Sequence, residues 1–165
     1  SIFSAWGSPN FSLLGTAVIF IPTVYCLTKS MVILSYNSTA IDASEKYWVF
    51  IPVSLIAGWT SLAIFLNWAP IANIAFGTSL YDTTTNIFVL VLALIWAVKI
   101  TYMSNGNLVF IFAILWGLSW LIVDFTNNNN LNTLIGYTTI FGIFLIIVST
   151  YLSRNPRKKF EEKKT

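Results

Sequence analysis

Five apolar runs, separated by short polar segments, divide the chain. They cover residues 10–36, 47–68, 86–102, 108–123 and 131–152. A helix needs roughly 20 residues to cross the hydrocarbon core of a bilayer, and each run is near that length. No run alternates as a barrel strand does, so helices are the elements that satisfy the backbone in lipid. The pattern predicts an all-α fold, an integral membrane bundle of five transmembrane helices in a single domain over residues 1–152.

The second run is the one from which we predict most of the helix packing. Pro52 falls near its first turn, where a missing N–H costs least. Ser54 and Gly58 share one face by their i, i+4 spacing, and small residues let a neighbouring helix come close in lipid. In the fourth run, Gly117 offers the same close approach. We therefore assign Pro52, Ser54, Gly58 and Gly117 to helix packing.

The segments between the runs contain residues typical of turns. Ser104-Asn-Gly-Asn107 predicts a tight turn in which Gly106 takes a positive φ. The longest connection, residues 69–85, contains an apolar stretch after Pro70. That stretch either continues the second helix or lies in the membrane interface. Residues 153–165 form a basic tail that we expect to be disordered.

Composition strengthens the membrane interpretation. The chain has 165 residues, of which 56% are hydrophobic and 9% are charged, whereas a soluble domain carries about 25% charged residues. The net charge of +3 does not indicate nucleic-acid binding, because six of the nine basic residues lie in the last twelve positions, mixed with acids. The lipid bilayer is the first expected partner, and no nucleic acid is expected.

The distribution of charge predicts a topology. If all five helices span, the nine Lys and Arg residues fall on one side of the membrane and Asp82 and Asp124 on the other. The positive-inside rule then places the N-terminus outside and the C-terminus inside, with a mitochondrial or plastid membrane compatible with that orientation. Lys29 is the one charge deep inside a run, since Lys99 lies near the end of residues 86–102. Lys29 either snorkels to the basic side or belongs to a site.

Catalytic chemistry is poorly supported. The chain has no histidine, which excludes imidazole ligation of haem and the usual zinc and copper sites. No two acids pair within a span, and no Ser or Cys has a base nearby in sequence. We expect no catalytic residue, no metal site, no required cofactor and no enzyme activity.

Tryptophan is the remaining unusual feature, with seven in the chain. Trp116 and Trp120 are one turn apart, and aromatic stripes at that spacing more often pack than bind. Together with Trp59 they would nevertheless line a cavity for a flat apolar ligand such as a lipid, a porphyrin or another pigment, with Asn67 as the polar contact.

The stretch Ile51-Pro-Val-Ser-Leu-Ile-Ala-Gly-Trp59, with Ala63 and Asn67 after it, is similar to a known signature. It resembles the Pro-Phe-Ser-Leu-Tyr-Leu-Gly-Trp-x-x-x-Ala motif of the tryptophan-rich sensory proteins, distant relatives of the translocator protein (TspO/MBR) family. Val53 stands where that motif has Phe. Residues 108–119, with Trp116 followed by Gly117, resemble the next block of the group. The match covers about residues 46–124.

The resemblance implies an all-helical bundle. In the translocator branch it implies porphyrin or sterol binding in a Trp-lined cavity, and Pro52, Gly58, Trp59, Asn67 and Trp116 are the matching positions. Members normally carry one or two helices before the region that corresponds to residues 10–36. We expect either that the N-terminus was processed, since Ser1 is not Met, or that the chain starts inside a longer one.

Three functions follow from these observations. We favour a non-catalytic accessory or structural subunit of a larger respiratory or photosynthetic membrane complex, because the loops are short and reactive groups are few. Other membrane-protein subunits would then be its partners. The first alternative is a translocator-protein-like binder of a flat hydrophobic ligand. The second is a transporter or channel, which only Lys29 and the prolines support.

Overall fold

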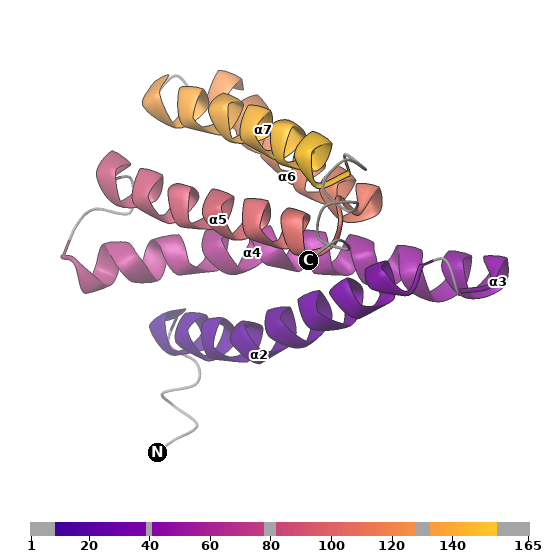
Figure 1. Cartoon of the computed structure of the whole chain (residues 1–165). Coiled ribbons are helices and arrows are strands. Elements are labelled where there is room, and N and C mark those ends of the chain that lie inside the picture. The colour runs from indigo at the N-terminus through magenta and orange to yellow at the C-terminus, as the bar shows by residue number, and fades with distance from the viewer. Residues whose placement is uncertain (1–8, 39–40, 78–81, 128–132, 155–165) are drawn as a thin grey trace, which may run out of the picture.

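The computed structural model describes residues 9–38, 41–77, 82–127 and 133–154, and within these ranges all regular structure is helical. The elements are α2 (Pro9–Tyr36), α3 (Ala43–Glu45), the π-helix η1 (Lys46–Phe50), α4 (Ile51–Ala75), α5 (Thr83–Met103), α6 (Leu108–Asn127) and α7 (Thr133–Arg154) (Figure 1). The predicted all-α membrane bundle is confirmed at this level. The predicted disorder of the tail falls on residues 155–165, which lie outside the described ranges.

Four of the described helical segments are long and apolar enough to cross a membrane. They are Val18–Tyr36, Ala43–Ala75, Thr83–Met103 and Thr133–Arg154, and α6 adds a shorter apolar stretch, Leu108–Val123. The chain is therefore an integral membrane protein. The fourth predicted span, residues 108–123, corresponds to this shorter stretch of α6.

Helix α4 lies at the centre of the bundle and packs against α2, α5 and α6. Helix α7 packs on α5 and α6, so α4, α5, α6 and α7 form a four-helix core, with α2 against the outer side of α4 (Figure 1). Although a short turn joins α5 to α6, these two helices make little contact and lie across the core from each other.

The helix that contains the sequence motif is longer than predicted. Elements α3, η1 and α4 continue one another from Ala43 to Ala75, whereas the apolar run spans residues 47–68. Pro52 is therefore preceded by helix, and its ring would clash with the carbonyl of residue 48 in an ordinary α-turn. The π-turn, in which the Ile51 N–H donates to the Lys46 carbonyl, lies just before it. This wider turn accommodates the proline.

Pro70 does not end α4. The helix continues to Ala75, so the apolar stretch after Pro70 extends the helix instead of lying separately in the interface. Gly77, at φ +66°, follows the helix end, and its N–H donates to the Ile74 carbonyl at 3.2 Å. A left-handed residue at this position satisfies carbonyls of the last turn.

The turn between α5 and α6 is a Schellman motif. The Gly106 N–H donates to the Thr101 carbonyl (2.9 Å) and the Asn105 N–H donates to the Tyr102 carbonyl (3.2 Å). Gly106 has φ +67°, as the sequence predicts, and Asn105 also lies in the left-handed region at φ 53°. A Cβ on Gly106 would lie 2.7 Å from Arg154 Cγ, so the end of α7 packs directly on this turn.

The small residues assigned to packing lie at helix contacts. Ser54 and Gly58 are buried on the face that α4 turns toward α6. A Cβ on Gly58 would lie 2.7 Å from the Phe110 carbonyl oxygen, and one on Gly117 would lie 2.6 Å from Leu62 Cδ1. Among the described residues, the largest fully buried apolar side chains are Phe110, Met31, Ile114, Leu118 and Ile146.

Candidate functional site

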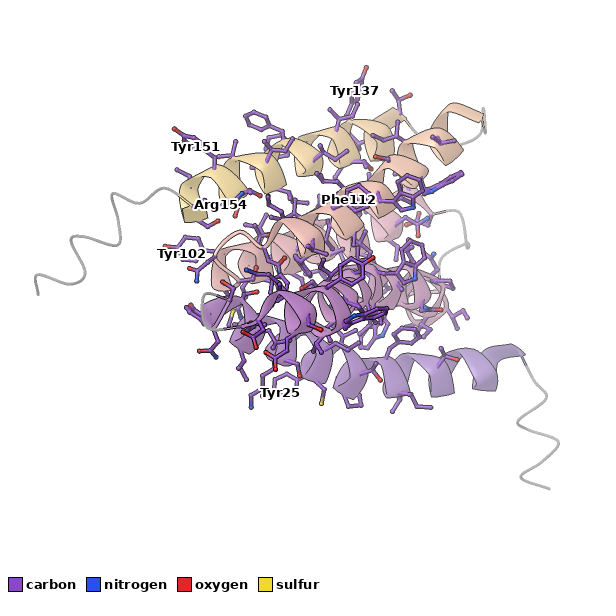
Figure 2. All side chains as sticks on the ribbon, turned by 90° about the vertical axis from the view of Figure 1, so that its right-hand side faces the viewer. Tyr25, Tyr102, Phe112, Tyr137, Tyr151 and Arg154 are labelled. Carbon is purple, nitrogen blue, oxygen red and sulfur yellow. The ribbon has the colours of Figure 1, made fainter. Side chains whose placement is uncertain are left out.

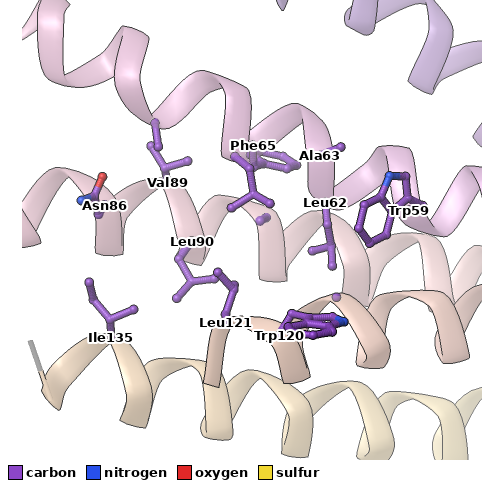
Figure 3. Close-up of a pocket in the computed structure, with 14 residues that line it drawn as sticks. Trp59, Leu62, Ala63, Phe65, Asn86, Val89, Leu90, Trp120, Leu121 and Ile135 are labelled. Atoms are coloured by element: carbon purple, nitrogen blue, oxygen red, sulfur yellow. The ribbon is translucent and has the colours of Figure 1, made fainter. Parts of the chain in front are cut away.

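A cavity of about 520 Å³ lies inside the four-helix core and is partly enclosed by all four helices (Figure 3). Its walls are almost wholly apolar. They are formed by Trp59, Leu62, Ala63, Phe65, Leu66 and Ala69 of α4; Asn86, Val89, Leu90 and Ala93 of α5; Gly117, Trp120 and Leu121 of α6; and Ile135 of α7. A concave apolar site of this size fits a small hydrophobic molecule.

The cavity occupies one end of the bundle. Its lining comes from the middle and second half of α4 and of α6 and from the first halves of α5 and α7. We call this the cavity end. At the opposite end, α2, α5 and α7 finish, and the Ala43–Ala75 helix and α6 begin. We call it the basic end, because the described basic residues gather there.

Two of the three predicted tryptophans line the cavity. Trp59 and Trp120 lie on neighbouring helices, α4 and α6, toward the same side of the cavity (Figure 3). Trp116 is not among the cavity residues. It lies in a shallower outer groove with Leu55, Trp59, Phe112 and Ala113. Its ring centroid is 6.3 Å from that of Trp120, in an edge-on contact, so Trp116 supports the cavity wall from outside.

The structure does not bring Asn67 to the cavity. Asn67 donates instead to the carbonyl of Ala63 on its own helix (2.9 Å). The amide that does line the cavity belongs to Asn86, whose Oδ1 accepts from Asn73 Nδ2 at 3.2 Å. Sequence reasoning missed Asn86, although its place one turn after Asp82 marks it as a polar residue at the start of an apolar run.

A profile of the TSPO-like protein family matches residues 5–152. This match covers nearly the whole chain and decides the family. The chain belongs to the TSPO-like protein family. The resemblance predicted from residues 46–124 is thereby confirmed and extends well beyond that range. No curated protein and no solved structure matches the chain.

At the basic end of this TSPO-like bundle, Asn107 joins three helices. Its Nδ2 donates to Ser35 Oγ of α2 (3.0 Å) and to Ser54 Oγ of α4 (2.9 Å). Its Oδ1 accepts from the N–H groups of Val109 and Phe110 and so caps α6. Asn107, Ser35 and Ser54 are all buried. Every hydrogen-bonding atom of this amide is used, so we call these three residues the amide clamp.

The described basic residues of the TSPO-like chain gather at the amide-clamp end. Lys46 begins η1, Lys99 lies in the last turns of α5, and Arg154 ends α7. Arg154 and Tyr102 lie at the same end of the bundle in Figure 2. Lys29 lies in the second half of α2, exposed, with its Nζ 5.7 Å from the Tyr25 ring centroid. This cation–π contact holds the ammonium beside Tyr25, one turn earlier on α2, so snorkelling toward the basic end stays a prediction.

Asp82 marks the cavity end. Its carboxylate accepts from the Thr85 N–H and from Thr85 Oγ1, both at 2.8 Å, and so caps α5. The backbone and hydroxyl hydrogen bonds from Thr85 lower the pKa of this carboxyl below its ordinary value. The group is therefore an anion at neutral pH, one helical turn from Asn86.

Trp96 has a different role from the cavity tryptophans. Its indole N–H donates to Ser61 Oγ at 3.3 Å and so ties α5 to α4. Among the described residues of this TSPO-like chain, no three His, Cys, Asp or Glu side chains gather as a metal site would require. The chemistry that the described cavity offers is apolar contact, aromatic stacking, the indole N–H groups of Trp59 and Trp120, and the Asn86 amide.

Proposed function

We propose that this TSPO-like protein binds a flat hydrophobic ligand in the cavity between α4, α5, α6 and α7. The observation that carries the proposal is the cavity of about 520 Å³, bounded by the indoles of Trp59 and Trp120. Stacking on aromatic faces suits a planar ligand, and apolar walls supply the burial. The family resemblance points to the same ligand class, porphyrins or sterols.

We also propose that α6 crosses the membrane, which gives five spans. The helix extends for 20 residues, Leu108–Asn127, and packs along both α4 and α7. The short Schellman turn reverses the chain between α5 and α6. With the described basic residues at one end, the N-terminus outside and the C-terminus inside is the orientation that the positive-inside rule favours.

The proposed role is non-catalytic, with bound lipid, sterol or pigment as ligand and not as a reactive cofactor. The accessory-subunit role stays a prediction, because an apolar outer surface suits lipid and a protein neighbour equally well. The binder is preferred here because a subunit role requires no cavity. A transporter or channel would call for paired charges inside the membrane, and Lys29 lies exposed on the outermost helix.

Filling the cavity tests the binder. Ala63 lines the cavity, and Ala63→Phe places a ring inside it. With protein purified in mild detergent, pyrene added as probe receives excitation energy from Trp59 and Trp120. We expect Ala63→Phe, or Ala69→Phe if the first variant folds poorly, to reduce this transfer at least tenfold. The matched control Ala75→Phe changes an exposed residue at the end of α4 and should bind as the original chain does.

Pyrene transfer that is equal in Ala63→Phe, Ala69→Phe and the original chain would overturn the binder. Native gel electrophoresis of mildly solubilised membranes tests the accessory-subunit role. Migration with a large complex, combined with unchanged pyrene transfer in the filled variants, would establish the accessory role in its place.

A further inference from the structure

The cavity has two chemically different ends. Figure 3 shows Trp59 and Trp120 toward one side of the cavity and Asn86 toward the other, with leucines between them. Leu62, which contacts Gly117, and Asn73, which bonds Asn86, are 11 residues apart on α4. That separation is about 16 Å along a helix. A ligand that fills the cavity therefore reaches from an aromatic end to an amide end.

The amide of Asn86 is held in one orientation. Its Oδ1 is engaged by Asn73 Nδ2, and Asn73 is buried on α4. Among the described residues, no acceptor is paired with the Nδ2 of Asn86 itself. With the oxygen occupied, this NH₂ group is the amide donor of the cavity lining, while Trp59 and Trp120 bring indole N–H groups to the aromatic end. The amide NH₂ is matched by an acceptor on the ligand.

Charge at this end excludes an anionic head group. The described cations Lys29, Lys46, Lys99 and Arg154 belong to the other half of the bundle. The nearest described charge along α5 is the Asp82 carboxylate, whose pKa is lowered, so it repels a second anion. An unpaired carboxylate in an apolar site is strongly disfavoured.

We infer that the ligand is an uncharged molecule with a flat apolar body and a hydrogen-bond acceptor, a ketone or ester carbonyl, at the end that meets Asn86. Asn86 is then a specificity-determining residue for the site. This inference rests on the proposed function, since it names the ligand class of the same cavity. It disfavours porphyrin dicarboxylates and favours neutral carbonyl compounds.

Three pyrene probes of similar length test the inference. They are 1-hexylpyrene, without a polar atom; methyl 1-pyrenebutyrate, with an ester carbonyl; and 1-pyrenebutyrate, an anion. Binding is followed by energy transfer from tryptophan and corrected for partition into empty micelles. Asn86→Leu removes the donor while keeping the volume, and Asn67→Leu makes the same change on α4 outside the cavity lining.

The original chain should bind the ester more tightly than the anion. Asn86→Leu should weaken ester binding about fivefold, the effect of one net hydrogen bond. It should leave 1-hexylpyrene binding unchanged or slightly tighter, which also shows that the variant is folded. Asn67→Leu should bind all three probes as the original chain does.

Equal ester binding by Asn86→Leu and the original chain, or tighter binding of the anion than of the ester, would overturn the inference while the hydrocarbon still binds. If none of the probes binds, or Trp120→Ala leaves all energy transfer unchanged, the proposed cavity function itself fails. The two failures are therefore distinguishable.

Discussion

Asn107 shows how much one polar side chain can determine in an apolar bundle. Its two N–H groups bond Ser35 and Ser54, and its oxygen caps the first turn of α6. Ser35 and Asn107 are 72 positions apart in the chain. The sequence suggested only that Asn107 belongs to a turn, because nothing local indicates which distant hydroxyls it meets.

We predict that Asn107→Ala destabilises the bundle by about 2 kcal/mol, which is the loss of an N-cap plus buried hydrogen bonds. Asn107→Asp keeps the capping oxygen but loses the donors to Ser35 and Ser54, so it should also destabilise. Unfolding in mixed micelles with increasing SDS measures both. Asn37→Ala, at an exposed end of α2, serves as control, and an Asn107→Ala midpoint equal to this control would contradict the clamp.

Asp82 gives a pH-dependent prediction. Because its pKa is lower in the folded state, its stabilising contribution is complete above the unfolded pKa, about 3.9. It is lost as the pH falls through the lower folded value. The substitution Asp82→Asn keeps a capping oxygen that does not titrate. The original chain should therefore lose more stability than Asp82→Asn as the pH is lowered from about 5 through the unfolded pKa and below it. If the thermal-unfolding temperatures of the original chain and of Asp82→Asn fall in parallel as the pH is lowered, this prediction is wrong.

At the scale of the element, the contact between α4 and α6 depends on a missing side chain. The Phe110 carbonyl oxygen would lie 2.7 Å from a Cβ on Gly58, and a backbone atom of a helix cannot move aside easily. Gly117 faces Leu62 Cδ1, the far end of a flexible side chain, which can move. The two glycines therefore look alike in the sequence but differ in what surrounds them.

We predict that Gly58→Ala destabilises the protein by about 1–3 kcal/mol through overpacking, reduced by up to about 1 kcal/mol through the better helix propensity of Ala. Gly117→Ala, its matched control, should be nearly neutral. SDS unfolding of the two variants compares them directly. A larger loss for Gly117→Ala than for Gly58→Ala would contradict the close approach of α4 to Phe110.

Helix positions were predictable, but helix rotations were not. The apolar runs are long and bounded by turn residues, so the predicted runs lie close to the observed helices. The interior of α4 is apolar nearly all round, and such a helix carries no polar face to fix its rotation. Asn67 and Asn86 were thus indistinguishable as cavity residues until packing placed Asn86 in the lining and Asn67 outside it. Trp116 lies in the outer groove and not in the cavity lining, because the rotation of α6 about its axis was not predictable either.

At the scale of the whole molecule, the order of the helices in the core could not be read from the sequence. Short turns usually join neighbouring helices, yet α5 and α6 lie across the core and α4 separates α2 from α7. This arrangement produces the cavity. Because α5 and α6 lie on opposite sides of the core, space remains between the four helices that direct packing of α5 on α6 would fill. The gathering of basic residues on one side, in contrast, could be predicted from the sequence, and the described basic residues lie at one end of the bundle.

The proposed orientation can be tested with single cysteines in a Cys26→Ser background. Lys46→Cys at the basic end and Phe76→Cys at the cavity end are both exposed positions. In oriented sealed vesicles, a membrane-impermeant maleimide should label Lys46→Cys only from the inside and Phe76→Cys only from the outside. Labelling of both from one side would contradict the topology.

The amide clamp has a consequence for how the protein is made. Ser35 leaves the ribosome long before Asn107 is synthesised, and α2 has α4 as its main docking surface among the described helices. During translation α2 must therefore remain beside a partly built chain until the start of α6 emerges and binds it through Asn107. A nascent chain halted before residue 107 lacks the hydrogen bond from Asn107 to Ser35 that joins α2 to the start of α6.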